Sequence, residues 1–366
     1  MSSRAGLHTR ISELITRLDA GRRDDLARDQ LLLELARHQL REVAPYARFA
    51  THRLRGRAVR TLDDVPALPT DAFRFARIAS RPESEDVRRF RSSGTTSEER
   101  SLHALQDLTL YDLSARSAAR YALFPDRPSS ELLILAPSEH ELADSSLSYM
   151  LARFCSWFSS GAASYIWPLG SAELSLLRAR LRAAEREQRP VALLGTSFAF
   201  VHALDALAAE RFTLPSGSRI MQTGGFKGRS REVPPAELRA SLSRTFGVDE
   251  ALVVAEYGMT ELSSQLYEHT LRDALLHAVP RPRRLWSPGW VRVGIVDPET
   301  LAPLPHGSEG LVRIDDLANL DSVAFIQTAD LGILDADGLE LRGRASAAVA
   351  RGCSISADEL LRARRP

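Results

Sequence analysis

The sequence lacks most of the signatures by which common site and localisation classes are recognised. Only two of its 366 residues are cysteines, which excludes a disulfide framework, so Cys155 is interpreted as a core thiol and Cys353 as a candidate reactive one. It contains no HExxH or CxxC spacing and no GxxxxGK[ST] loop, which argues against a protein-built metal centre and a Walker-type phosphate loop. The amino-terminal segment has no apolar signal-peptide core, and no long hydrophobic run occurs. These absences predict a cytoplasmic protein without a membrane span.

Charge of either sign is not in excess, and lysine is nearly missing. With 48 basic and 47 acidic residues the net charge is +1, so no strong field favours a nucleic acid as partner. The run Arg281, Arg283 and Arg284 is interpreted as a solvated loop. Among the 48 basic residues only Lys227 is a lysine. Because an ammonium differs from a guanidinium in hydration and donor geometry, position 227 is a candidate functional site, with a surface turn as the alternative.

Hydrophobic periodicity predicts a mixed α/β fold. Two helices are expected between residues 11 and 43, ending near Pro45 and covering a sheet. Short apolar runs then alternate with helical patterns, which is typical of a parallel sheet with helices on its faces. Beyond Trp286 a period-two pattern predicts a smaller antiparallel sheet. The expected helices are 105–123, 172–188 and 198–209, and the expected strands are 132–136, 164–169, 191–195, 220–223, 251–256, 290–296, 310–314, 324–327 and 339–341.

Three polar segments interrupt this pattern, and each has a structural as well as a functional interpretation. The segment 92–97 (SSGTTS) is either a loop whose backbone N–H groups and hydroxyls approach a polyphosphate or a solvated turn. The segment 256–261 (EYGMTE) follows an apolar strand, at the edge where α/β sheets bind ligands. The segment 328–344 contains TADLG, DADG and RGR, which also describe a β-hairpin with a charged end.

In this order and at these distances, the three segments resemble the signature motifs of the adenylate-forming superfamily, which includes acyl-CoA ligases and luciferases. The resemblance covers residues 91–344. The strings PTDAFR, DSSLSYM, TGGFKGR and RGCS, which begin at residues 69, 144, 223 and 351, are most similar to LuxE-type acyl-protein synthetases, with phenylacetate-CoA ligases next. The resemblance implies an adenylating α/β domain over residues 1–341. It also implies a vestigial carboxyl-terminal segment over residues 342–366.

The same resemblance implies a site for ATP with Mg²⁺. It implies that Tyr257 covers the adenine, Thr260 bonds the α-phosphate, Asp330 accepts the ribose hydroxyls and Glu261 ligates the metal. The remaining residues that it assigns to nucleotide binding are Ser92, Ser93, Gly94, Thr95, Thr96, Arg100, Gly224, Gly225, Phe226 and Gly258.

Positive charge is scarce where the implied chemistry needs it. Attack of a carboxylate on a phosphate brings anions together, and relatives supply a lysine from a separate carboxyl-terminal domain. Only 22 residues (345–366) follow Arg344, and none is lysine, so Lys227 or Arg229 is expected to supply the cation while Arg344 contacts the ribose–phosphate region. Cys353 lies nine residues beyond Arg344, a length that spans up to about 30 Å when extended. It is predicted to take the acyl group, with a packed small side chain as the alternative.

The predicted function is ATP-dependent activation of a carboxylic acid, with a fatty acid favoured, followed by transfer of the acyl group to Cys353. An acyl reductase or another acceptor protein would then remove it. Two alternatives stay open: transfer to CoA or a carrier protein, and a nucleotide-binding scaffold without turnover. The scaffold would explain why Ser97 and Ala329 stand where relatives carry glycine. The residues expected beside the acyl chain are His140, Ser145 and Ser146. The sequence decides neither the length of the acyl chain nor whether the protein forms a homo-oligomer.

Overall fold

The computed structural model describes residues 3–92, 100–127, 129–161, 163–167, 173–224 and 233–345. They form two compact units. The first unit comprises the described parts of Met1–Ser117, Met259–Gln265 and Trp286–Pro366, and the second those of Ala118–Gly258 and Leu266–Leu285. The motif at 256–261 therefore begins in the second unit and ends in the first. The domain boundary expected between residues 341 and 342 falls inside strand β14 (Gly338–Arg344) and stays a prediction.

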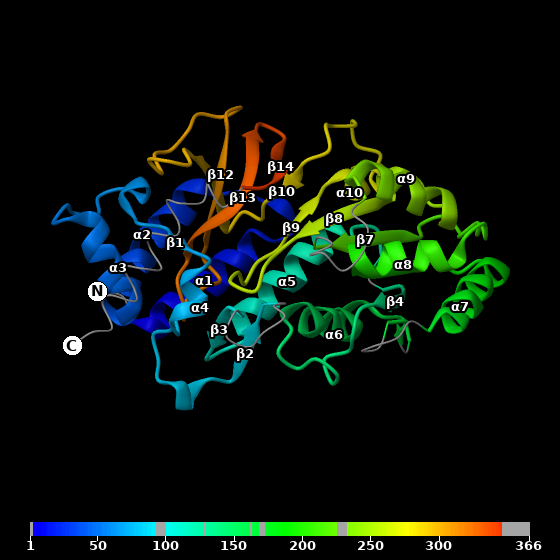
Figure 1. The fold of residues 1–366 in the computed structure, drawn as a ribbon, viewed down its shortest axis with the longest axis horizontal. Coiled ribbons are helices and arrows are strands. Elements are labelled where there is room, and N and C mark those ends of the chain that lie inside the picture. Colours follow the sequence, from blue (N-terminus) through cyan, green and yellow to red (C-terminus); the bar gives the residue numbers. More distant parts are fainter. Residues whose placement is uncertain are drawn as a thin grey trace. The chain divides into compact units, whose positions relative to one another are not determined.

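The second unit contains a parallel sheet with helices beside it, and Figure 1 shows β7 and β8 with α8 and α9 in its green to yellow-green part. The strand order is β9-β8-β7-β6-β4-β5, and every neighbouring pair is parallel except β8 with β9. This confirms the predicted alternation of strands and helices. The elements are β4 (Glu131–Leu135), α6 (Ser146–Phe158), β5 (Ser164–Tyr165), α7 (Leu174–Glu187), β6 (Val191–Thr196), α8 (Ser197–Leu207), β7 (Arg219–Thr223), α9 (Pro235–Phe246), β8 (Val253–Tyr257), β9 (Leu266–Glu268) and α10 (Thr270–Leu275).

The register of this sheet aligns the carboxyl ends of three strands. Thr196 at the end of β6 pairs with Thr223 of β7, which in turn pairs with Glu256 of β8. Helix α8 begins directly after β6 because the Thr196 hydroxyl accepts the backbone N–H of Ala199 at 3.2 Å and caps it. Apolar side chains of this sheet pack against those of α7, α8 and α9 in a buried cluster that includes Phe200. The residues that follow β7 and β8 therefore emerge at the same edge, where ligands of α/β proteins bind.

The first unit contains the antiparallel sheet predicted beyond Trp286, and Figure 1 shows its strands β12, β13 and β14 in orange to red. The order is β11-β12-β13-β14, all antiparallel, with β1 added parallel to β13. Its elements are α1 (Arg4–Arg17), α2 (Asp25–Glu42), α3 (Ala44–Leu54), β1 (Leu68–Pro69), α4 (Ala72–Phe75), β2 (Arg88–Arg91), β3 (Leu102–Leu105), β11 (Val291–Val296), β12 (Glu309–Asp316), β13 (Phe325–Asp335) and β14. Helix α5 (Thr109–Ala122) and strand β10 (Leu285–Trp286) each begin in one unit and end in the other.

Three sequence-based expectations differ from the structure. The second amino-terminal helix, α2, ends at Glu42, near Pro45 as predicted, but an unexpected third helix, α3, follows. Pro45 occupies the first turn of α3, where a missing N–H costs no helical hydrogen bond. The helix expected from residue 105 begins at Thr109, because the preceding residues form β3. The arginine run is not simply solvated, since Arg281 pairs with Asp273 at 2.9 Å and Arg283 with Glu268 at 2.6 Å.

No helix within the described ranges is long and apolar enough to cross a membrane.

Candidate functional site

A buried set of polar side chains holds the segment 259–265, which carries two of the predicted site residues. The Asn319 amide donates to the backbone carbonyl of Glu261 at 2.8 Å. The Asp316 carboxylate accepts the backbone N–H of Ser263 at 3.0 Å and the hydroxyl of Ser264 at 2.7 Å. All five residues are buried. Because every one of these bonds is made away from water, the backbone at Glu261 is fixed.

Asp316 and Asn319 are themselves supported by neighbouring elements of the first unit. Helix α2 contributes Gln39, whose amide nitrogen donates to the Asn319 carbonyl at 2.7 Å. The Trp290 indole donates to the Ser264 hydroxyl at 3.1 Å. Burial raises the pKa of Asp316 even though its carboxylate accepts several hydrogen bonds. Sequence reasoning missed this network, and the polar string DDLANLDS at 315–322 between apolar strands was its only signal.

Thr260 and Glu261 lie in this supported segment. The carbonyl of Thr260 is 2.7 Å from Nδ1 of His103, a residue that sequence reasoning did not single out. The Glu261 side chain is largely withdrawn from solvent, with 6% of the residue exposed. Among the described residues, no group of three or more His, Cys, Asp and Glu side chains could hold a metal ion by itself.

The structure brings Asp330 and Arg344 together. They lie directly opposite each other on β13 and β14, and the next residue, Ala345, donates its N–H to the Ala329 carbonyl at 2.8 Å. Asp330 is half-buried and Arg344 is exposed. The Asp330 backbone N–H donates to the hydroxyl of buried Thr328 at 3.1 Å, which holds the strand at this point. A carboxylate and a guanidinium are thus presented by one hairpin of the first unit.

Ser92, the first residue of the predicted phosphate-binding segment, is hydrogen-bonded to Ser101, which lies just beyond that segment. The Ser92 N–H donates to the Ser101 carbonyl at 3.1 Å, and the Ser101 N–H donates to the Ser92 hydroxyl at 2.9 Å. The Arg100 guanidinium donates to the Ser92 carbonyl at 2.6 Å, so this side chain contacts the backbone of its own hairpin. A phosphate contact by Arg100 stays a prediction. Outside the described residues lie Ser93, Gly94, Thr95 and Thr96.

In the second unit, Gly224, Tyr257 and Gly258 follow the aligned ends of β7 and β8. Gly224 has a φ of +70°, which favours glycine, and among the described residues, its chain neighbours aside, no atom lies within 4 Å of the position that a Cβ would take. Its carbonyl accepts the hydroxyl of Ser197, the first residue of α8, at 2.8 Å. Tyr257 is half-buried. Contact of Gly224 with the adenine stays a prediction, and Gly225, Phe226, Lys227, Arg229 and Cys353 lie outside the described residues.

Glu256 is a buried carboxyl group at the same edge that sequence reasoning assigned no role. It is 7% exposed, and the Thr223 hydroxyl on the neighbouring strand donates to its carboxylate. Burial raises the pKa of Glu256 to about 7, and the hydrogen bond from Thr223 offsets only part of that effect.

Stability should therefore fall with rising pH because of Glu256. Its pKa is 4.5 when exposed and about 7 in the folded state, so the stabilisation by the neutral carboxyl is complete below pH 4.5 and is lost as the pH rises to about 7. We expect the Glu256→Gln variant to be more stable than the wild type at pH 8, by roughly 3 kcal/mol, and about equally stable at pH 4, below the unfolded pKa. Denaturant unfolding at both pH values checks this. Glu237→Gln, at an exposed position in α9, is the control, and equal pH dependence of wild type and Glu256→Gln would contradict the prediction.

The residues expected beside the acyl chain lie between β4 and α6. His140 is exposed in the turn after β4. The Ser145 hydroxyl accepts the backbone N–H of Ser148 at 3.1 Å and is the N-cap of α6, while Ser146 is the first residue of that helix. Ser145 therefore has a structural role, and contact of these residues with an acyl chain stays a prediction.

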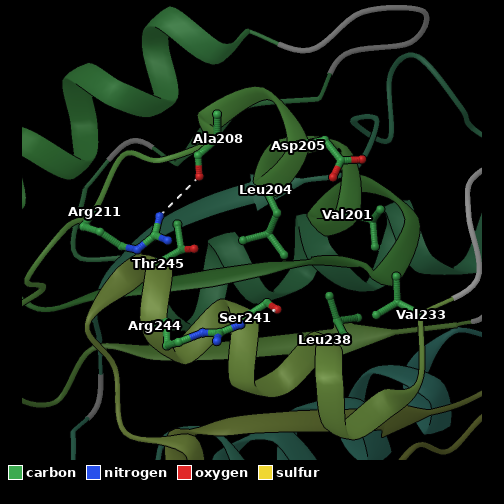
Figure 2. Close-up of a pocket in the computed structure, with 10 residues that line it drawn as sticks. All are labelled: Val201, Leu204, Asp205, Ala208, Arg211, Val233, Leu238, Ser241, Arg244 and Thr245. Atoms are coloured by element: carbon green, nitrogen blue, oxygen red, sulfur yellow. Dashed lines mark hydrogen bonds between the residues drawn. The ribbon is translucent and has the colours of Figure 1, made fainter.

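A surface pocket of about 160 Å³ lies between α8 and α9 (Figure 2). Its floor is apolar, with Leu204 and Leu238, and Arg211 lies at its rim, where it donates to the Ala208 carbonyl at 3.2 Å. None of the predicted site residues lines this pocket. Within the described part of the second unit, this pocket and the strand ends that carry Gly224 and Tyr257 are therefore different places.

Comparison with solved structures identifies the fold. The chain is similar to 2-hydroxyisobutyryl-CoA ligase in its open conformation with 2-HIB-AMP and CoA, with a TM-score of 0.64 and 14% identity over 90% of this chain and 77% of that one. The same ligase in its thioesterification state gives a TM-score of 0.65 over 91% of this chain and 71% of that one. At this identity the likeness concerns the fold, and it confirms the expected adenylate-forming architecture.

Sequence comparisons give the family. The chain is 23% identical over 323 residues to the long-chain-fatty-acid–luciferin-component ligase of Vibrio harveyi, a match that covers 84% of this chain and 81% of that protein. It is 22% identical to the ligase of the same name from Aliivibrio fischeri, over 84% of this chain and 79% of that protein. The model of the family described as acyl-protein synthetase, LuxE, matches residues 16–362. The chain therefore belongs to the LuxE acyl-protein synthetase family, whose members are ATP-dependent, AMP-forming acid–thiol ligases.

Proposed function

We propose that this chain activates a long-chain fatty acid with ATP and then holds the acyl group as a thioester on its own Cys353. Family membership supports acid activation, and the names of the two ligases from Vibrio harveyi and Aliivibrio fischeri favour a long-chain acid. The observation that carries the proposal is the supported segment 259–265. It holds Thr260 and a largely buried Glu261 carboxylate on a backbone fixed by Asn319 and Asp316.

The residues present fit a magnesium ion that is held jointly with a nucleotide. Mg²⁺ prefers oxygen ligands and usually takes one or two carboxylates together with substrate phosphates, rather than a cage built by protein alone. Glu261 offers such a carboxylate, and the described residues contain no larger cluster of ligands. In our proposal Glu261 binds the ion, which neutralises phosphate charge when bound.

The remaining roles follow the chemistry of an acyl-phosphate anhydride. A carboxylate oxygen of the fatty acid attacks the α-phosphorus, and the bond to the pyrophosphate oxygen breaks, so acyl-AMP and pyrophosphate form. Thr260 bonds the α-phosphate, Asp330 orients the ribose, and Lys227 or Arg229 supplies positive charge as the anions approach. The Cys353 thiolate then attacks the acyl carbonyl carbon and AMP leaves.

We further propose that an acyl reductase or another acceptor protein removes the acyl group. A protein-bound thioester is useful only if a second nucleophile or a reductant consumes it. Because ATP is the co-substrate, we place the reaction in the cytoplasm. The relatives' names, which mention a luciferin component, support an acceptor of this kind.

Acid-dependent ATP–pyrophosphate exchange tests the first half-reaction. With the purified full chain, Mg²⁺ and labelled pyrophosphate, we expect label to enter ATP only when an acid is present. Exchange should be faster with a long-chain saturated acid than with a short-chain one, because each buried methylene contributes about 0.8 kcal/mol of binding. Phenylacetate is the aromatic control, and faster exchange with it would contradict the fatty-acid assignment. ATP binding without exchange for any acid would support the scaffold alternative instead.

A further inference from the structure

His103 lies in strand β3 of the first unit and is fully buried. Its Nδ1 is 2.7 Å from the carbonyl oxygen of Thr260, a residue 157 positions away in the sequence. A carbonyl oxygen only accepts hydrogen bonds, so Nδ1 carries the hydrogen. The other ring nitrogen, Nε2, is buried and has no hydrogen-bond partner among the described residues. The contacts therefore select one tautomer, the neutral ring protonated at Nδ1.

The surroundings of the ring keep it neutral and in place. Phe73, from the segment 69–74, packs edge-on against it with ring centroids 5.9 Å apart and an interplanar angle of 83°. Burial lowers the pKa of His103 to about 4, although the hydrogen bond to Thr260 and the field of Asp321 act in the opposite direction. At neutral pH the ring is thus an uncharged donor with a fixed orientation.

The same hairpin supports two of the predicted anion-binding segments. Strands β2 and β3 pair from Arg88 to Leu105. Beyond this pairing, Ser101 is hydrogen-bonded to Ser92, the first residue of the predicted phosphate-binding segment. Through His103, β3 also holds Thr260. The next carbonyl, that of Glu261, is held from the other side by Asn319. Two successive carbonyls of the segment 259–265 are therefore fixed by different elements of the first unit.

We propose that His103 is a positioning residue for adenylation, whose Nδ1–H fixes the Thr260 carbonyl and so ties hairpin β2–β3 to the segment that carries Thr260 and Glu261. The inference rests on the proposed function, because the roles of Thr260 and Glu261 come from it. His103 does not touch the nucleotide in this scheme. It acts by holding the backbone that presents the Thr260 hydroxyl and the Glu261 carboxylate.

Three substitutions separate this role from simple core packing. Asparagine can place an N–H near the position of Nδ1, glutamine places its N–H near the position of Nε2, and leucine has no donor. For His103→Leu and His103→Gln we expect about a tenfold lower kcat for acid-dependent exchange and a several-fold higher KM for ATP, because a displaced reacting group is costly. His103→Asn should retain most of the wild-type kcat. Equal values for the three variants, or wild-type values for His103→Leu, would overturn the proposal.

A second measurement tests the geometry without relying on activity. Nitrogen-15 NMR of histidine-labelled full-length protein at pH 7 should show a resonance of a histidine protonated at Nδ1 that is absent from the spectrum of His103→Asn and still neutral at pH 5. A second Nδ1-protonated histidine, His269, faces the Arg284 carbonyl at 2.9 Å and should remain in the variant. Assignment of the His103 resonance to the Nε2–H tautomer would overturn the inference even if exchange is normal. Conversely, if the wild-type chain catalyses no ATP–pyrophosphate exchange with any of the acids tested, the proposed function is refuted. The NMR result would still decide whether His103 holds Thr260.

Discussion

Replacing Glu261 with glutamine should reduce acid-dependent ATP–pyrophosphate exchange by about a thousandfold, equivalent to about 4 kcal/mol of transition-state stabilisation. Glutamine has the same size but no charge, so it would bind Mg²⁺ weakly. The fold of the segment should persist because Asn319 bonds the backbone carbonyl of residue 261, which the substitution leaves intact. Initial rates of exchange at saturating fatty acid, measured across a range of Mg²⁺ concentrations, check the prediction.

Two controls separate loss of the metal ligand from loss of structure. Glu237→Gln removes a carboxylate at an exposed position of α9 and should leave exchange unchanged. The melting temperature of Glu261→Gln should stay close to that of the wild type, while its requirement for Mg²⁺ should rise. If Glu261→Gln exchanges within threefold of the wild type at every Mg²⁺ concentration, Glu261 is not the metal ligand.

The sequence predicted those parts of the fold that depend on neighbours along the chain. Period-two hydrophobicity and an Asp-Gly turn are local signals, so the β13–β14 hairpin was predictable, and with it the placement of Asp330 opposite Arg344. Short apolar runs are also a local signal, and they predicted β4, β5, β6, β7 and β8 of the second unit but not the short β9. Helix α3 was missed, because a proline such as Pro45 is compatible both with the end of one helix and with the first turn of the next.

The support of the candidate site could not be predicted, because it consists of contacts between distant segments. Asp316 meets Ser264 across 52 positions, and His103 meets Thr260 across 157. Nothing in the local pattern around a histidine in a short strand indicates which carbonyl it will meet. Glu256 was within a recognised motif, but its elevated pKa depends on burial against β7, which periodicity does not report.

Replacing Cys353 with serine should abolish stable acylation of the protein and leave ATP–pyrophosphate exchange within about twofold of the wild type, because the thiol acts only after acyl-AMP has formed. Cys353 lies outside the described residues, so the prediction rests on the sequence and on family membership. The measurement is incubation with radiolabelled fatty acid, ATP and Mg²⁺, followed by denaturing electrophoresis. Label on the wild type should be removed by neutral hydroxylamine, which cleaves thioesters.

The only other cysteine gives the matched control. Cys155, in α6, has its Sγ 3.8 Å from the Tyr165 hydroxyl, and burial raises the pKa of its thiol. A thiol held in the protonated form is a poor nucleophile, so Cys155→Ser should accept label as the wild type does. Label that persists in Cys353→Ser but disappears in Cys155→Ser would assign the thioester to the second unit. If Cys353→Ser still converts CoA to acyl-CoA at the wild-type rate, the acyl group passes from the adenylate to a free thiol, and the chain acts as a CoA ligase.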